Sequence, residues 1–290
     1  MDDAIRTGLA QGEQAGSRYR LMPPRQTPTG QMGAQLGHRV GSSIEFMDYR
    51  TYQPGDDLRR VDWSAYARSD RLTVKLYREE VCPHVDVLLD ASRSMAISAS
   101  PKAQAAAALA AAITTAADNA KFTHNLYLAG EQIRPIPGGN ARPGAWGGIQ
   151  FAGTSALDTL LEQGPPLWRR RGVRVLISDL LFDAQPAHLL RQLARDAASL
   201  CVVQVLGRCD ITPPPRGNFR LVDHETGQVR ELYIDAAAEK RFQQRLNDHQ
   251  AAWQDACRQV GATMTQLIAE PLLKSWDLSD LVKLGVLQVN

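Results

Sequence analysis

The chain has 290 residues, of which 44% are hydrophobic and 22% are charged, so it can bury a substantial core in one large domain or in one domain with an appendage. A formal net charge of +2 gives no argument for nucleic acid or an anionic membrane as a partner. The sequence contains no long apolar run, no signal-peptide core and no Cys-x-x-Cys pair, so we expect a cytoplasmic protein in a reducing compartment, without membrane insertion.

The first part of the chain lacks the pattern of a large domain. Residues 1–34 are polar and rich in Gly, Gln and Pro, which predicts a flexible, locally basic lead-in. Residues 35–83 alternate short apolar and charged positions with Gly and Pro between them. This pattern predicts a β-rich appendage of short strands and turns rather than helices.

Residues 84–290 alternate strand-like and helix-like segments, which indicates an α/β domain with a mostly parallel sheet. We expect strands at 84–90, 125–128, 172–179, 200–206 and 262–268, and a hairpin of 219–222 with 229–234. We expect helices at 101–120, after Thr154, from Pro186, at 236–260 and at 270–285. Three cysteines, Cys201, Cys209 and Cys257, lie in segments that predict burial as thiols.

The end of the first of these strands carries the most informative motif. Asp90, Ser92 and Ser94 are spaced two residues apart, so their side chains can converge as oxygen donors of the kind that Mg²⁺ prefers. Open α/β sheets bind ligands at the carboxyl ends of their strands. Downstream, Thr154 lies between a glycine and a helical pattern, and Asp179 ends a second apolar strand, so these two residues are candidates for the rest of the shell.

This arrangement resembles a von Willebrand factor A domain. The metal-ion-dependent adhesion site of such domains is written as Asp-x-Ser-x-Ser, a distant Thr and a distant Asp, and all of these positions are filled here. The resemblance implies a doubly wound, mostly parallel sheet with helices on both faces. It also implies that Ser92, Ser94 and Thr154 bind the cation directly while Asp90 and Asp179 hold it through waters. The alternative is that both carboxylates cap helices and the hydroxyls bond loop amides, without an ion.

A second resemblance rests on the segments around the appendage. The segments Gly41–Phe46, Arg50–Asp57, Arg59–Trp63 and Ala67–Arg68, together with the Asp-x-Glu-Thr-Gly turn at Asp223–Gly227, are similar to the bacterial domain-of-unknown-function family fifty-eight. Many of its members are associated with MoxR-type AAA+ ATPases. The resemblance therefore implies such an ATPase, and its client protein, as partners.

The expected function is that of an adaptor rather than an enzyme, in which Mg²⁺ or another divalent cation bridges to an acidic residue of the partner. One alternative is a metal-dependent phosphohydrolase that uses Asp90 and Asp179, although Ser92 stands where aspartate-nucleophile phosphatases need a second Asp. A third is a metal-free scaffold of the same fold. The scattered histidines and the missing nucleotide and nucleophile-elbow motifs exclude standard zinc hydrolases, kinases and dehydrogenases.

The densest charged cluster runs from Arg50 to Trp63. It is either a partner-docking surface, because Trp and Arg dominate interface hot spots, or an ion-pair network that ties the appendage to the main sheet. Its alternating signs favour the network.

Overall fold

A computed structural model describes residues 2–23, 44–79, 83–97, 99–222 and 229–290 of the chain. These residues belong to two compact units. One unit comprises residues 1–27 and 83–290 and contains the large sheet, whereas the other comprises residues 28–82.

The large sheet is six-stranded within the described residues and has the strand order β11-β8-β7-β4-β5-β6. Its strands are β4 (His84–Asp90), β5 (Thr123–Ala129), β6 (Ile133–Pro135), β7 (Val173–Ser178), β8 (Ser199–Leu206) and β11 (Thr263–Ile268). All neighbouring strands are parallel except β6, which pairs antiparallel with β5 at one edge. The mixed α/β class and the mostly parallel sheet are confirmed.

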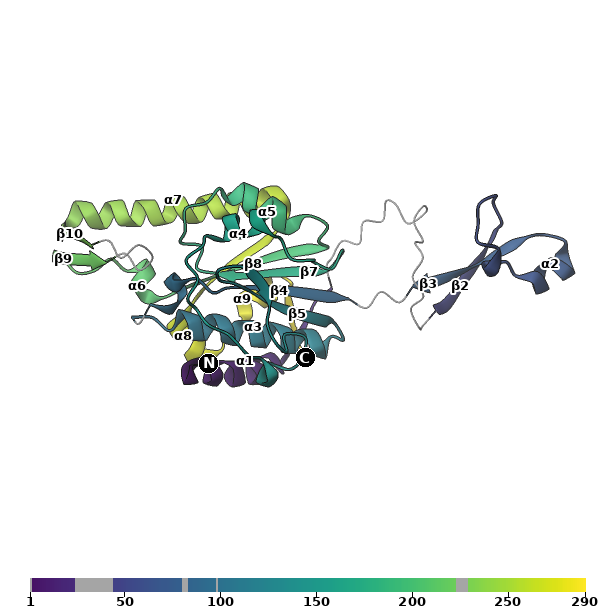
Figure 1. Cartoon of the computed structure of the whole chain (residues 1–290), viewed down its shortest axis with the longest axis horizontal. Coiled ribbons are helices and arrows are strands. Elements are labelled where there is room, and N and C mark those ends of the chain that lie inside the picture. Colours follow the sequence, from purple (N-terminus) through teal and green to yellow (C-terminus); the bar gives the residue numbers. More distant parts are fainter. Residues whose placement is uncertain (1, 24–43, 80–82, 98, 223–228) are drawn as a thin grey trace. The chain divides into compact units, whose positions relative to one another are not determined.

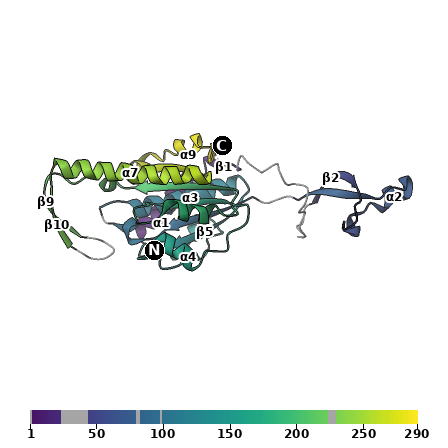
Figure 2. The same ribbon diagram turned by 90° about the horizontal axis from the view of Figure 1, so that it is seen from above.

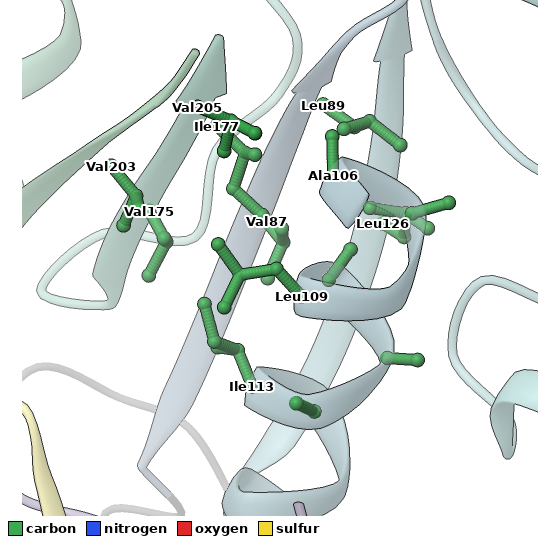
Figure 3. Packing of buried hydrophobic residues seen from close by; sticks show 14 of the residues in the cluster. Val87, Leu89, Ala106, Leu109, Ile113, Leu126, Val175, Ile177, Val203 and Val205 are labelled. Carbon is green, nitrogen blue, oxygen red and sulfur yellow. The ribbon is translucent and has the colours of Figure 1, made fainter. Parts of the chain in front are cut away.

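Helices cover both faces of this sheet (Figure 1). One face packs on α3 (Lys102–Asn119) and α8 (Ala269–Ser275), and α1 (Asp3–Gly16) packs along α3. The other face packs on α4 (Leu157–Gln163), α5 (Pro186–Ala194) and α7 (Ala236–Val260). Alternation along β4 explains the two cores, because Val87 and Leu89 belong to the first cluster while Leu88 belongs to the second. Figure 3 shows the first cluster, where Leu109 and Ile113 of α3 lie over the valines of the sheet.

The expected flexible lead-in is wrong for the described residues before 24. Residues 3–16 form α1, which packs along α3, and β1 (Tyr19–Leu21) pairs antiparallel with β12 (Leu287–Val289) at the other end of the chain. The physical reason is the spacing of Gly8, Gly12 and Gly16, which lets the two helix backbones approach closely. A Cβ built on Gly12 would collide with the carbonyl oxygen of Ala108. Residues 24–34 lie outside the described ranges.

Within its described residues, the smaller unit contains one antiparallel pair of strands and one short helix. β2 (Ile44–Thr51) pairs antiparallel with β3 (Thr73–Glu79), and a 3₁₀ turn at Leu58–Arg60 precedes α2 (Trp63–Ser69). The expectation of strands and turns alone was wrong at α2, because the Asp62 carboxylate caps the helix by accepting from two backbone N–H groups. Arg50 pairs with Asp56 at 2.6 Å and Lys75 with Asp62 at 3.4 Å, so these ion pairs join parts of the unit itself.

The other expected elements towards the end of the chain are present, with one difference. β9 (Gly217–Val222) and β10 (Val229–Ile234) form the expected hairpin beyond the short helix α6 (Arg208–Ile211), and Figure 2 shows it near the start of α7. The Asp223–Gly227 turn lies outside the described residues. The expected helix over 270–285 is divided into α8 and α9 (Ser279–Lys283), because Trp276 adopts a left-handed backbone conformation that ends α8.

Cys201 and Cys257 are buried as expected, whereas Cys209 is exposed because it lies on the short α6 rather than in the sheet. None of the helices in the described ranges combines the length and apolar composition needed to cross a bilayer.

Candidate functional site

The candidate residues meet where the winding of the sheet changes direction. The chain leaves β4 through α3 and enters β5 on one side, whereas β7 lies on the other side of β4. Asp90 is the last residue of β4, and Asp179 directly follows β7. Such switch points, at the carboxyl ends of parallel strands, are where open α/β sheets bind ligands.

Asp90 is a buried carboxylate at the centre of this edge. Its Oδ1 accepts a hydrogen bond from the backbone N–H of Ser92 at 2.9 Å, and its Oδ2 accepts one from the Ser178 hydroxyl at 2.6 Å. No basic side chain of the described residues forms an ion pair with it. Burial, followed by the nearby Asp179 carboxylate, raises the pKa of Asp90 to about 6.

The three hydroxyl candidates lie on two loops that are bonded to each other. Ser92 and Ser94 have their hydroxyl oxygens 2.9 Å apart at the start of a 3₁₀ turn, Arg93–Ala96. The backbone at Gly153 bonds to both sides of Ser92, accepting from the N–H of Arg93 and donating to the carbonyl of Ala91. Thr154, the next residue, is therefore placed beside the serines by backbone pairing.

Glu131 is a further residue of this edge that the sequence analysis missed. It lies in the turn between β5 and β6, and its carboxylate accepts from the backbone N–H and the hydroxyl of Thr154, both at 3.1 Å. Gly153 lets the two loops approach closely, because a Cβ on Gly153 would lie 2.7 Å from the Cα of Gly130. Since the Thr154 hydroxyl donates its proton to Glu131, its lone pairs remain available to a cation.

Asp179 is fully buried and forms an ion pair that the sequence analysis also missed. The ammonium of Lys102, the first residue of α3, lies 2.8 Å from Asp179 Oδ2 and 3.0 Å from Asp210 Oδ2. The backbone N–H of Leu181 donates to the other oxygen, Asp179 Oδ1, at 3.1 Å. Burial alone would lower the pKa of Lys102, but the Asp179 and Asp210 carboxylates outweigh burial and raise it.

The chemistry of these donors fits a hard divalent cation. All five predicted residues offer oxygen, as Mg²⁺ requires. This edge of the sheet holds the carboxylates of Asp90, Asp179 and Asp210 and the buried ammonium of Lys102. It therefore carries excess negative charge, which a cation would balance. No cluster of three or more His, Cys, Asp or Glu side chains suited to a metal is found in the described part of the chain. Any cation here would therefore depend on the hydroxyls.

Comparisons with known proteins give one family and several relatives. The model of the family described as "Protein of unknown function DUF58" matches residues 48–252. The uncharacterized proteins Rv1480 of Mycobacterium tuberculosis and Mb1516 of Mycobacterium bovis are each 30% identical to this chain, over 87% of it and 81% of their own length.

Two solved structures are also similar. The conserved hypothetical protein BatB of Bacteroides thetaiotaomicron aligns over 69% of this chain and 99% of its own, with 12% identity and a TM-score of 0.37. An aerotolerance-related membrane protein of Bacteroides fragilis aligns over 62% of this chain and 98% of its own, with 14% identity and a TM-score of 0.32.

Proposed function

We propose that this chain, which belongs to the DUF58 family of proteins of unknown function, is a protein-interaction module. Its contact with a partner would depend on a divalent cation. The observation that carries the proposal is the position of Asp90, Ser92, Ser94, Thr154 and Asp179 at the switch point of a mostly parallel sheet. This arrangement supports a von Willebrand A-like domain with an adhesion-type site.

Each side chain has a role in this proposal. The Ser92 and Ser94 hydroxyls and the Thr154 hydroxyl would contact Mg²⁺, or another divalent cation, while Asp90 and Asp179 would hold it through water. When bound, the cation supplies an electrophilic point that a carboxylate can reach. Because the direct protein ligands are neutral hydroxyls, an Asp or Glu of a partner would complete the shell.

The partner class follows from the resemblance described above. A MoxR-type AAA+ ATPase would bind this edge, and the module would act as an adaptor that presents a client protein to it. The role is one of binding rather than catalysis. In support, the residue two after Asp90 is Ser92, which cannot serve as the acid of an aspartate-nucleophile phosphatase.

The proposal is tested by titrating Mg²⁺ and Mn²⁺ into the purified protein by calorimetry, with and without a MoxR-type ATPase of the same organism. We expect saturable binding that the double variant Ser92→Ala/Ser94→Ala loses. The matched control is Ser64→Ala/Ser69→Ala, which removes two exposed hydroxyls from α2 and should leave binding unchanged.

The ATPase arm separates the two non-enzymatic alternatives. Cation-dependent capture of the ATPase that disappears in Ser92→Ala/Ser94→Ala would support the adaptor. Equal capture by the wild type and by this variant, in the presence of a chelator, would overturn the cation dependence and favour the metal-free scaffold.

A further inference from the structure

We infer that Lys102 is a built-in counterion that competes with the divalent cation for Asp179 and so keeps the cation affinity of the site low. The inference rests on the proposed function, because it concerns the strength of binding at the same site. Its consequence is that a further carboxylate, supplied from outside the chain, is needed to hold the cation firmly.

The position of Lys102 is unfavourable for an ordinary lysine. Its side chain is fully buried, and it stands at the amino terminus of the eighteen-residue helix α3, where the helix dipole disfavours a positive charge. Burial of an ammonium is strongly unfavourable unless it is paired. The cost is offset by Asp179 and Asp210, at 2.8 and 3.0 Å from the ammonium, so its location depends on these two carboxylates.

The Asp210 end of this contact is fixed by the loop after β8. Asp210 Oδ2 also accepts from the backbone N–H of Gly207 at 2.8 Å. Gly207 in turn lies directly against Ser100, two residues before Lys102, because a Cβ on Gly207 would collide with the Ser100 hydroxyl. Lys102 is therefore held between the ends of β7 and β8, with its ammonium on Asp179.

The charge at this edge explains the effect on cation binding. Lys102 neutralises part of the charge of Asp179 and occupies its Oδ2, while the backbone N–H of Leu181 occupies Oδ1. A cation that binds beside Asp90 consequently meets an Asp179 carboxylate whose charge is partly neutralised. A charge at about 4–6 Å changes an ionic equilibrium by about one to three powers of ten, so the ammonium is a strong competitor.

The test compares Mn²⁺ and Mg²⁺ dissociation constants, measured by calorimetry, across a set of variants. Lys102→Met removes the ammonium, and Asp210→Asn leaves Lys102 with Asp179 alone. The double variant Lys102→Met/Asp210→Asn removes one charge of each sign, so its net charge equals that of the wild type. It also avoids leaving both Asp179 and Asp210 without a cationic partner. The double variant therefore replaces Lys102→Met in the comparison if that single variant does not fold. The control is Lys240→Met, at an exposed position of α7.

We expect Lys102→Met and the double variant to bind the cation at least about tenfold more tightly than the wild type, and Asp210→Asn to bind it more weakly. Equal affinity of the wild type and the double variant would overturn the inference while leaving the proposed function in place. Binding by the double variant but not by the wild type would support the competition in its strongest form. No binding by any of the proteins would remove both the inference and the proposed function.

Discussion

The Ser178 hydroxyl donates a 2.6 Å hydrogen bond to Asp90 Oδ2, which joins the ends of β4 and β7. The same hydroxyl accepts from the backbone N–H of Leu180 at 2.9 Å, at a residue whose φ is +57°. Ser178 therefore supports both the buried carboxylate of one strand and the sharp turn that follows the other.

Ser178→Ala should destabilise the protein, because it removes a buried hydrogen bond to a carboxylate and leaves the Leu180 N–H without its partner. We expect a loss of about 1–3 kcal/mol in the free energy of unfolding, measured by urea denaturation. Ser17→Ala removes an exposed hydroxyl bonded to the carbonyl of Gln14 and should cost about 0.5 kcal/mol or less. Equal effects of the two substitutions would contradict this role for Ser178.

The raised pKa of Asp90 predicts how stability depends on pH in protein freed of divalent cations. The folded pKa is about 6, and that of an unfolded aspartate is about 3.9. The folded protein retains a proton between these values, so the contribution is complete below pH ~4 and is lost as the pH rises through about 6. We expect the free energy of unfolding to fall by about 2 kcal/mol from pH 4 to pH 7, relative to Asp90→Asn. Parallel pH profiles for the two proteins would refute this assignment.

Gly12→Ala should destabilise the large unit although alanine favours helix formation. The gain in helix propensity is about 1 kcal/mol, whereas the added methyl group overlaps the backbone of Ala108 in α3, and overpacking typically costs about 1–3 kcal/mol or more. We expect a lower midpoint of thermal unfolding. Gly144→Ala is the control, because a Cβ at Gly144 enters open space. An unchanged midpoint for Gly12→Ala would show that α1 does not depend on this close approach.

The cysteines should differ sharply in reactivity. Burial raises the pKa of Cys201 to about 11 and that of Cys257 to about 12, so both thiols remain protonated and inaccessible at pH 8. Cys209 is exposed. Mass spectrometry after treatment of the native protein with iodoacetamide should therefore find Cys209 modified before Cys201 and Cys257. Modification of all three cysteines at similar rates would contradict the burial of Cys201 and Cys257.

Local sequence predicted the parts of the fold that depend on neighbouring residues. The apolar run before Asp90 and the one before Asp179 are typical of buried parallel strands, and both carboxylates lie at the expected strand ends. The helix α2 could also have been predicted, because Asp62 is a favoured N-cap residue and Gly and Pro are absent from the segment that follows.

Contacts between distant residues could not be predicted in this way. Lys102 at the start of a helix resembles a solvated residue, and its partner Asp179 is 77 positions away. Glu131 and Thr154 lie on different loops and meet because Gly153 lets its loop pass close to the backbone of Gly130. In α1, the four-residue spacing of Gly8, Gly12 and Gly16 beside Ile5 and Leu9 was the sequence signal for a packed helix. The glycine content of this part of the chain, however, resembled that of a flexible segment.

The smaller unit interrupts the larger one, since residues 28–82 lie between β1 and β4. A single proteolytic cut between these strands would divide the covalent chain without separating α1 from α3, or β1 from β12. The two products would remain together as a split protein, and the segment 1–27 could be supplied in trans as a peptide that complements residues 83–290.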